Sequence, residues 1–347
     1  MKIVFYSDTE NLNTGSYRIW VHDLNTTLVE TGIDSKVVHY NLELIDKDAD
    51  VVIFCKSAYK RIQEFKKTSS RTVIGAINVS CDYYDPNIDF VIAGSPEEYA
   101  SLSRYKNVFI YPLIEKKFEN IKRKEHTLDR DVLTIGFHGH YPHLFKFEPF
   151  LKNAIEGYDK NIKKVELNII TGNPGFEWKT GRPDVKINIF NYDENFSEVI
   201  SSCDVGVVPN VSDIRMSFPK IQEIKSIEFG LYDTDYYLRL KNKTNAGRAY
   251  VFYQHGIPVI HDLSPSSFEL MKITGYNICA HDSNGWYREL CNLTDYKKRE
   301  EISKAYYAAF DKYYNLKDCS KKLINSIENV KYLKSLLVRK RGKNVQD

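Results

Sequence analysis

The chain has 347 residues, of which 42% are hydrophobic and 27% charged, a composition that argues against a disordered protein. Its 49 basic and 46 acidic residues leave a formal net charge of +3, which disfavours a dedicated nucleic-acid-binding protein. No apolar run approaches the roughly 20 residues that a helix needs to cross a bilayer. The length predicts two domains of ordinary size.

The cysteines indicate a cellular compartment. There are six, spread widely along the chain, and none forms a CxxC pair. The sequence also shows no signal peptide. We therefore expect reduced thiols and a cytoplasmic protein.

Short apolar runs alternate with helical stretches in the first third of the chain. We expect strands at 2–7, 35–40, 49–56, 72–78, 89–94 and 107–112. A helix is expected at 16–32, ended by Gly32, and another begins at Ser95, Pro96 and Glu97, which suit a helix N-terminus. Runs that are apolar throughout are typical of a parallel sheet covered on both faces.

A second series of the same kind comes after a charged stretch at 115–131, which we interpret as a linker. We expect strands at 132–139, 165–170, 185–190, 204–209, 258–262 and 276–280, and helices at 146–158, 195–202, 243–255 and from about 284 onward. The pattern predicts two tandem doubly wound α/β domains, covering residues 1–125 and 130–315. Such sheets bind ligands beyond the carboxyl ends of their strands, so we expect a site in a central cleft between the domains.

Several well-known loops are missing from the sequence. The loop after the first strand lacks GxGxxG, which disfavours a dinucleotide site there. Neither the P-loop pattern GxxxxGK[ST] nor the hydrolase pattern GxSxG occurs. These absences disfavour a dinucleotide site at the first loop and exclude a P-loop and the most readily recognised hydrolase arrangement.

The segment KTNAGR at 243–248 opens a predicted helix that ends at Gly256. Cations at a helix N-terminus are unfavourable unless an anion lies between them and the free backbone N–H groups. An ordinary N-cap with solvated cations is the alternative. We favour a diphosphate site made by Lys243, Thr244, Asn245, Gly247 and Arg248.

The segment HGHYPH at 138–143 concentrates three histidines. Zinc ligation by these histidines is one interpretation, but no second ligand cluster follows, and a closed zinc site needs about four ligands. Solvated surface histidines are another. We favour a phosphate-binding loop in which Gly139 allows close backbone approach and His140 contacts phosphate or sugar.

Five segments, taken in order, resemble a known family. They are NTGSYRIWVHDLNTTLVETG, DFVIAGSPEEYASL with NVFIYPLIEKKF, TIGFHGH, VISSCDVGVVPN and KTNAGRAYVFYQHGIPVI. The set is similar to the nucleotide-sugar-dependent glycosyltransferases with two Rossmann-like domains, called GT-B, and to their GT4-like group. The chain departs from that group in lacking its E-x7-E pair, since Glu223 and Glu228 are five residues apart, and in having NVSCDYYD where a histidine is usual.

The resemblance implies a cytoplasmic enzyme that moves a sugar from a nucleotide-diphosphate donor to a hydroxyl acceptor. It implies a saccharide or lipid-linked acceptor, in bacterial surface polysaccharide or glycolipid synthesis, with no metal cofactor. The second domain would hold the donor, and a C-terminal helix at about 318–340 would pack back on the first domain. A sugar-nucleotide epimerase and a non-catalytic nucleotide-binding protein are the alternatives.

Further candidates lie on other loops. Asp82, after the fourth strand, is the first candidate for the base that activates an acceptor hydroxyl, and Asp85 is the second. Both are also ordinary turn residues. Arg215 and Lys220 come after the VVPN strand end and are candidates for additional phosphate or sugar contacts.

Gly15, Ser16 and Arg18 lie where the first helix begins. We interpret them as contacts to donor phosphate or acceptor across the cleft, with a helix-face cation as the alternative for Arg18. The C-terminal segment IENVKYLKSLLVRKRGK is amphipathic and basic. It suits peripheral association with an anionic membrane as well as packing against the first domain.

Overall fold

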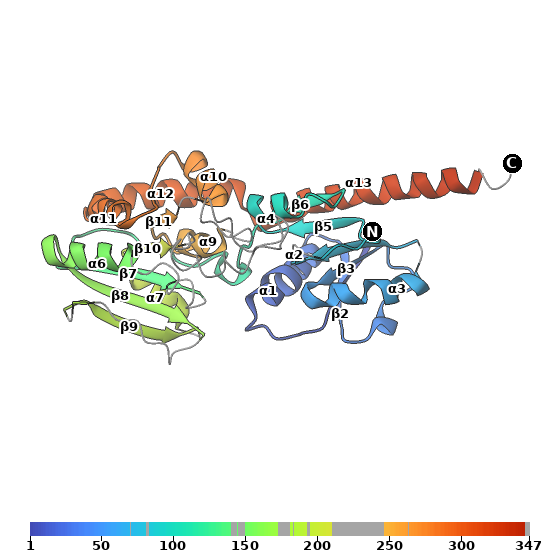
Figure 1. The fold of residues 1–347 in the computed structure, drawn as a ribbon, viewed down its shortest axis with the longest axis horizontal. Coiled ribbons are helices and arrows are strands. Elements are labelled where there is room, and N and C mark those ends of the chain that lie inside the picture. Colours follow the sequence, from blue (N-terminus) through green and yellow to red (C-terminus); the bar gives the residue numbers. More distant parts are fainter. Residues whose placement is uncertain are drawn as a thin grey trace, which may run out of the picture. The chain divides into compact units, whose positions relative to one another are not determined.

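The computed structural model describes residues 1–69, 71–80, 83–139, 144, 150–172, 181–182, 184–192, 195–209, 246–262 and 264–343. The chain divides into two compact units (Figure 1). The first comprises Met1–Lys116 together with Tyr314–Asp347, and the second comprises Lys117–Tyr313. Every strand expected from the apolar runs is present.

The first unit contains a six-stranded parallel sheet in the order β2-β1-β3-β4-β5-β6. Its strands are β1 (Lys2–Ser7), β2 (Asp34–His39), β3 (Val51–Cys55), β4 (Val73–Ile77), β5 (Phe90–Ala93) and β6 (Val108–Ile110). Its helices are α1 (Gly15–Tyr17), α2 (Leu24–Glu30), α3 (Ile62–Thr68), α4 (Pro96–Ser101) and α13 (Leu316–Lys343). Short 3₁₀ segments occur at Leu42–Leu44 and Lys56–Arg61.

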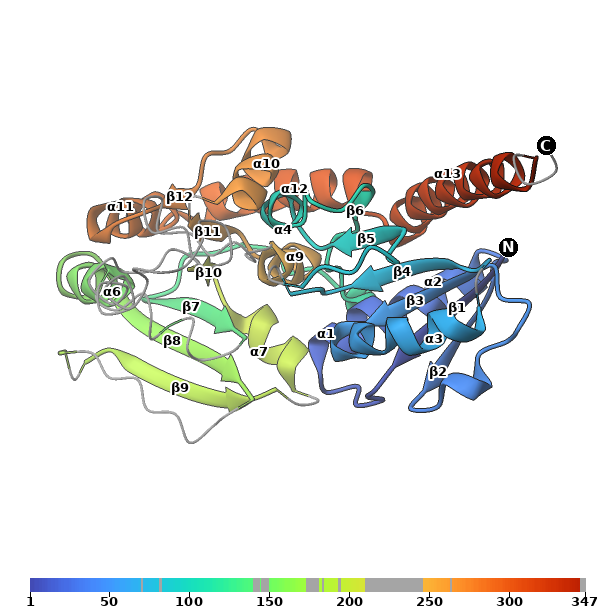
Figure 2. The same cartoon turned by 45° about the vertical axis from the view of Figure 1, so that its right-hand side comes forward.

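Both faces of this sheet are covered, which explains why its central strands are apolar throughout. Alternate residues of the strands, such as Tyr6 and Phe54, pack in one cluster with Ile62 and Phe65 of α3. Helix α13 lies against α2, β4 and β6 (Figure 2). The expected N-cap is confirmed, since the Ser95 side chain accepts a hydrogen bond from the backbone N–H of Glu98 at 3.1 Å.

The first helical stretch differs from the regular helix expected at 16–32. Between α1 and α2 the chain forms a π-helical segment, Arg18–Asp23. Asp23 is buried in it, and its carboxylate accepts a hydrogen bond from the backbone N–H of Lys116 at 3.3 Å. The spacing of apolar residues cannot reveal this π-helical segment, because the residue that the segment buries, Asp23, is charged.

The second unit contains another six-stranded parallel sheet, in the order β12-β11-β10-β7-β8-β9. Its strands are β7 (Val132–His138), β8 (Lys164–Thr171), β9 (Lys186–Asn191), β10 (Val205–Val208), β11 (Val259–Asp262) and β12 (Cys279–Ala280). Its helices are α6 (Phe150–Asn161), α7 (Phe196–Ser202), α9 (Gly247–Gln254), α10 (Pro265–Thr274), α11 (Ser283–Asn292) and α12 (Tyr296–Tyr313).

Helix α9 is buried on nearly all sides and packs against β10, β11 and α12. It approaches β10 closely because residue 206 is glycine: a Cβ there would lie 2.6 Å from the Phe252 ring. The prediction of two doubly wound α/β domains is confirmed. That they face a central cleft stays a prediction.

Candidate functional site

The second sheet has a point at which the strand order reverses. Strand β7 pairs with β8 on one side and with β10 on the other. Open α/β sheets bind ligands at such a point, beyond the carboxyl ends of the strands. Gly139 directly follows β7, Pro209 directly follows β10, and α9 begins at Gly247.

Arg248 extends from the first turn of α9 into this point. Its guanidinium Nη2 donates a hydrogen bond to the Pro209 carbonyl oxygen at 2.8 Å and lies over Phe137, 5.7 Å from the guanidinium carbon to the ring centroid. Burial lowers the pKa of Arg248 to about 10, so it still carries a positive charge at neutral pH. The structure therefore holds a cation beyond the ends of β7 and β10.

Gly139 makes room for this arginine. Its φ is +121°, a conformation that side chains rarely adopt. A Cβ at this position would lie 3.1 Å from Cδ of Arg248. Glycine is needed here both for the backbone conformation and for the close approach.

His138 fixes the start of α9. The ring is buried against Phe196 and Phe252, and its Nε2 donates a hydrogen bond to the carbonyl oxygen of Arg248 at 2.9 Å. Burial lowers the pKa of His138 to about 3, so the ring stays neutral. Because Nε2 is used in this bond, His138 positions Arg248 and does not offer that nitrogen to a metal.

The structure thus brings together three of the predicted donor residues, Gly139, Gly247 and Arg248. The helix begins at Gly247, later than residue 243 at which the sequence predicts its start, and Ala246 occupies the N-cap position. The remaining donor-side and catalytic candidates lie outside the described residues: Asp82, His140, Arg215, Lys220, Lys243, Thr244 and Asn245. Among the described residues, no group of three histidine, cysteine or acidic side chains could hold a metal ion.

The carboxyl edge of the first sheet has a different character. Tyr40, Lys56 and Asn78 have φ values of 59°, 53° and 55°, and each directly follows a strand, β2, β3 or β4. The left-handed region is unfavourable for residues with a side chain by roughly 1–2 kcal/mol. Backbone strain of this kind gathers at functional sites, so this edge is a second candidate site.

Polar side chains line the same edge. The Tyr17 hydroxyl forms a hydrogen bond with Nε2 of His39 at 2.8 Å, and burial raises the pKa of Tyr17, so the phenol stays protonated. The Tyr6 hydroxyl and the Arg61 guanidinium both donate to the Tyr40 carbonyl oxygen, at 2.9 and 2.7 Å. Phenol, imidazole and amide groups suit a ligand rich in hydroxyls.

Of the predicted residues at the first helix, Arg18 has partners within the first unit. Gly15 and Ser16 lie in α1, at the start of the helical stretch. Arg18 Nη2 forms an ion pair with Glu115 Oε2 at 2.9 Å, and Nη1 donates to the Leu12 carbonyl oxygen at 2.8 Å. The Arg18 side chain is only 12% exposed. It is therefore not a solvated cation on a helix face, and its contact with phosphate stays a prediction.

The structure corrects the interpretation of Asp85 as a base. This carboxylate is buried and accepts hydrogen bonds from the backbone N–H and the side-chain amide of Asn87, both at 2.8 Å. It also accepts a bond from the Tyr83 hydroxyl at 3.3 Å. Asp85 holds a turn and is not available to a substrate.

Some residues of these edges were missed from the sequence. Tyr40, Lys56 and Asn78 each come directly after an apolar run, which is a signal for the carboxyl end of a strand. Nothing in the residue types of Tyr40 and Lys56 indicates a positive φ. The pairing of Tyr17 with His39 depends on contacts between α1 and β2, which no local pattern reveals.

No protein-family model matches the chain, and no curated protein matches it by sequence. Solved structures do match. A glycosyltransferase from Rickettsia africae has a TM-score of 0.61 at 11% identity, over 95% of this chain and 98% of that one. Sucrose-phosphate synthase from Thermosynechococcus elongatus has a TM-score of 0.59 at 11% identity, over 95% of this chain and 99% of that one. HepE from Anabaena in complex with UDP has a TM-score of 0.58 at 10% identity, over 95% of this chain and 100% of that one. At these identities the similarity shows the fold, which is that of GT-B proteins.

Proposed function

We propose that the protein is a glycosyltransferase that moves a sugar from a nucleoside-diphosphate sugar to a hydroxyl acceptor. The observation that carries this is Arg248, held between Gly139 and Pro209 at the point where the strand order reverses. A fixed cation beyond the strand ends suits a diphosphate. One solved structure with the same fold is a complex with UDP.

The chemistry needs a positive charge at this place. Transfer breaks the bond between the anomeric carbon and a diphosphate oxygen, and negative charge develops on the departing diphosphate. A cation already in position stabilises that charge without reorganising. We propose that Arg248 does so together with Lys243, Arg215 and Lys220, without a metal ion.

We place the acceptor at the carboxyl edge of the first sheet. The Tyr17 and His39 pair and the residue Asn78 supply hydrogen-bonding groups there. Such groups suit a saccharide or the sugar of a glycolipid, in keeping with bacterial surface polysaccharide or glycolipid synthesis. Asp82 is our proposed base for the acceptor hydroxyl, and His140 our proposed contact to phosphate or sugar.

We further propose a cytoplasmic enzyme that associates with a membrane surface through α13. The described cysteines, Cys55, Cys203, Cys279, Cys291 and Cys319, are all free thiols, which supports a reducing compartment. In the part of the chain that the structure describes, no helix could span a bilayer. Helix α13 exposes Tyr332, Leu333 and Leu337 and ends in a basic sequence, a combination that favours binding at a membrane surface.

Turnover of sugar nucleotides tests the proposed function. The protein is incubated with UDP-, GDP-, dTDP- and ADP-sugars, with and without saccharide and glycolipid acceptors, and the released nucleoside diphosphate is measured. We expect release from one donor that depends on an acceptor. Conversion of the sugar without release would instead show an epimerase, and binding without any conversion would show a nucleotide-binding protein.

A further inference from the structure

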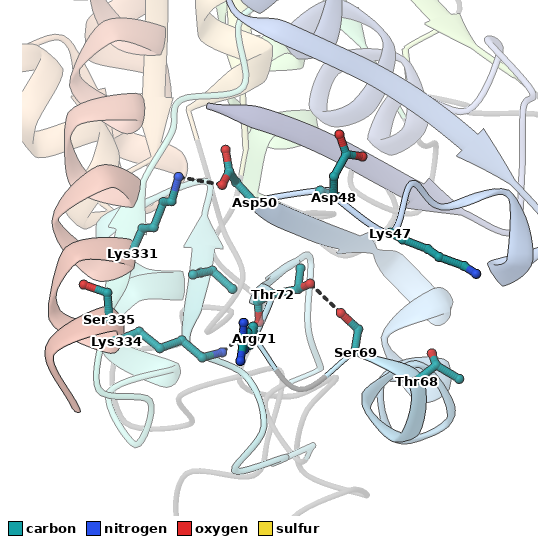
Figure 3. A pocket seen from close by; sticks show the side chains of 12 residues that line it. Lys47, Asp48, Asp50, Thr68, Ser69, Arg71, Thr72, Lys331, Lys334 and Ser335 are labelled. Atoms are coloured by element: carbon teal, nitrogen blue, oxygen red, sulfur yellow. Dashed lines mark hydrogen bonds and ion pairs between the residues drawn. The ribbon is translucent and has the colours of Figure 1, made fainter. Parts of the chain in front are cut away.

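The chain passes between the two units twice, after Lys116 and after Tyr313. The second crossing leads into α13, whose Lys331 pairs with Asp50 at 2.6 Å, as Figure 3 shows. Asp50 directly precedes β3, so this attachment lies at the amino end of the first sheet. Both candidate edges lie at the carboxyl ends of strands. The second crossing therefore leads to neither candidate edge.

The first crossing is a single peptide bond between Lys116 and Lys117. Lys116 is fixed to the first unit, because its Nζ pairs with Glu30 at 2.6 Å and its backbone N–H donates to the Asp23 carboxylate at 3.3 Å. Lys117 follows it directly and begins the second unit. The contacts that hold Lys117 therefore also fix the point at which the second unit begins.

Aromatic rings hold the Lys117 ammonium. Its Nζ lies 4.5 Å from the ring centroid of Phe118, 4.6 Å from that of Tyr192 and 5.1 Å from that of Phe196. It also donates a hydrogen bond to the Tyr192 hydroxyl oxygen at 3.4 Å. A cation within about 6 Å of a ring centroid is attracted by the negative face of the ring. Three rings thus hold one ammonium group, although Lys117 as a whole is exposed.

The same rings pack against the histidine that fixes Arg248. Phe118 and Phe196 are stacked, with centroids 5.4 Å apart and planes at 19°. Phe196 in turn meets His138 edge to face, with centroids 5.4 Å apart and planes at 88°. His138 Nε2 donates to the carbonyl oxygen of Arg248 at 2.9 Å. Direct contacts thus run from Lys117 through Phe196 and His138 to the first turn of α9.

The charge of Lys117 also acts on this histidine. The pKa of His138 is lowered first by burial, and repulsion from Arg248, His255 and Lys117 acts in the same direction. Burial lowers the pKa of His255 as well, again with a contribution from Lys117. The ammonium therefore lies close enough to oppose protonation of the ring that holds Arg248.

We propose that Lys117 is a positioning residue for the diphosphate site of the second unit. Its ammonium holds Phe196 against His138, and His138 holds the turn of α9 that carries Arg248. Because Lys117 directly follows a residue fixed in the first unit, the crossing and the diphosphate site are coupled. Such coupling is reciprocal: a bound diphosphate orders the crossing, and a disturbed crossing weakens diphosphate binding. The ligand in this inference rests on the proposed function, whereas the contacts do not.

The first measurement is hydrogen exchange of the full chain without any nucleotide. The backbone N–H groups of Ala249 and Tyr250 both donate to the Ala246 carbonyl oxygen, at 2.8 and 3.1 Å. Exchange in peptides that cover 246–254 therefore reports whether the first turn of α9 is formed. Affinity is then measured by isothermal titration calorimetry with UDP, GDP, dTDP and ADP.

Four variants separate the charge of Lys117 from the rings around it. Lys117→Met removes the charge and keeps an apolar stem, and Lys117→Arg keeps a cation that stacks on aromatic rings. Tyr192→Leu removes one ring and leaves the lysine. The matched control is Lys122→Met, the same loss of charge at another exposed lysine close by in sequence.

We expect Lys117→Met and Tyr192→Leu to speed exchange in 246–254 and to weaken nucleoside-diphosphate binding about three- to tenfold. Lys117→Arg should behave nearly as wild type, and Lys122→Met should change nothing. Exchange in peptides that cover α11 should stay as in wild type, since a merely structural loss would spread through the unit. Nucleotide added to wild type should slow exchange in peptides that cover 113–120.

Unchanged exchange in 246–254 in both Lys117→Met and Tyr192→Leu would overturn the proposal. It is also overturned if Lys117→Met alone weakens nucleotide binding while α9 exchanges as in wild type, because the lysine then acts on the ligand by its charge and positions nothing. If wild type binds none of the four nucleotides, the proposed function fails. Exchange without nucleotide still decides in that case whether Lys117 positions α9.

Discussion

The two units have sheets of the same build but differ in the residues at the carboxyl ends of their strands. In the second unit Gly139 and Pro209 follow the strands at the reversal, and Arg248 of α9 lies beside them, within electrostatic reach of the Asp262 carboxylate at the end of β11. In the first unit the strand ends carry Tyr40, Lys56 and Asn78, whose side chains remain although their backbone is strained. The second unit presents glycine and backbone beside a buried arginine, whereas the first unit keeps side chains at its strand ends, among them the cation of Lys56. One fold thus provides two kinds of binding edge.

The units also differ in their histidines. Among its described residues the second unit buries four histidines, and burial lowers the pKa to about 4 in His126 and His255 and to about 3 in His138 and His261. The first unit has only His22 and His39, and neither is buried. Acid should therefore act unequally on the two units.

The largest predicted effect arises from these histidines. An unfolded histidine has a pKa of about 6.5, so below that pH the unfolded chain binds protons that the folded second unit does not. Its free energy of unfolding should fall from about pH 6.5 toward pH 4, by about 1.4 kcal/mol per pH unit for each histidine. Hydrogen exchange measured by mass spectrometry at pH 7 and pH 5, corrected for the intrinsic rate, should show the second unit opening first.

A pair of variants sharpens this test. His255→Gln retains hydrogen bonding to Ser197 and the Val251 carbonyl but cannot titrate, so it should lower the pH slope of the second unit. His22→Gln, at an exposed position, should leave the slope unchanged. Equal acid sensitivity of the two units would contradict the comparison.

The second prediction concerns the cation of the second unit. Arg248→Met keeps an apolar stem of similar length and removes the charge, so nucleoside-diphosphate affinity should fall about 10- to 100-fold. Isothermal titration calorimetry measures this. Arg123→Met is the control, since Arg123 is paired with Asp311 in the same unit. If both variants bind the nucleotide like wild type, the diphosphate does not contact Arg248.

The third prediction concerns the glycine beside it. Gly139→Ala forces a Cβ into a backbone conformation with φ of +121° and against Arg248, so the second unit should lose roughly 1–3 kcal/mol of stability. Gly172→Ala, at a position with nothing within 4 Å of the added Cβ, should change little. Urea unfolding of the two variants makes the comparison, and equal stabilities would refute the assigned role of Gly139.

The smallest effect is expected at the strained edge of the first unit. Lys56→Gly relieves a left-handed conformation at an exposed side chain and should stabilise the first unit by up to about 1 kcal/mol. Lys60→Gly, in the 3₁₀ segment after β3, should destabilise it instead. Thermal melting distinguishes the two signs. A loss of stability in Lys56→Gly would mean that the side chain makes contacts worth more than the strain.

Much of the fold could be predicted from the sequence because buried parallel strands need continuous apolar runs. The same apolar runs placed Gly139 at the end of a strand and Arg248 near the start of a helix. The two cations at that helix start, Lys243 and Arg248, led to the prediction of an anionic ligand. The strained residues Tyr40 and Lys56 could not be predicted, because their φ values are set by packing around the sheet. The roles of His138 and Glu115 were equally hidden, since each depends on a partner about 100 residues away in sequence.

The most direct test of the division between the two edges is hydrogen exchange of the full chain with and without the nucleoside diphosphate that it binds. The account predicts slower exchange in peptides that cover 136–139 and 246–254, and unchanged exchange in those that cover 38–41, 54–57 and 76–79. Protection of the first unit's edge without protection around Arg248 would contradict it.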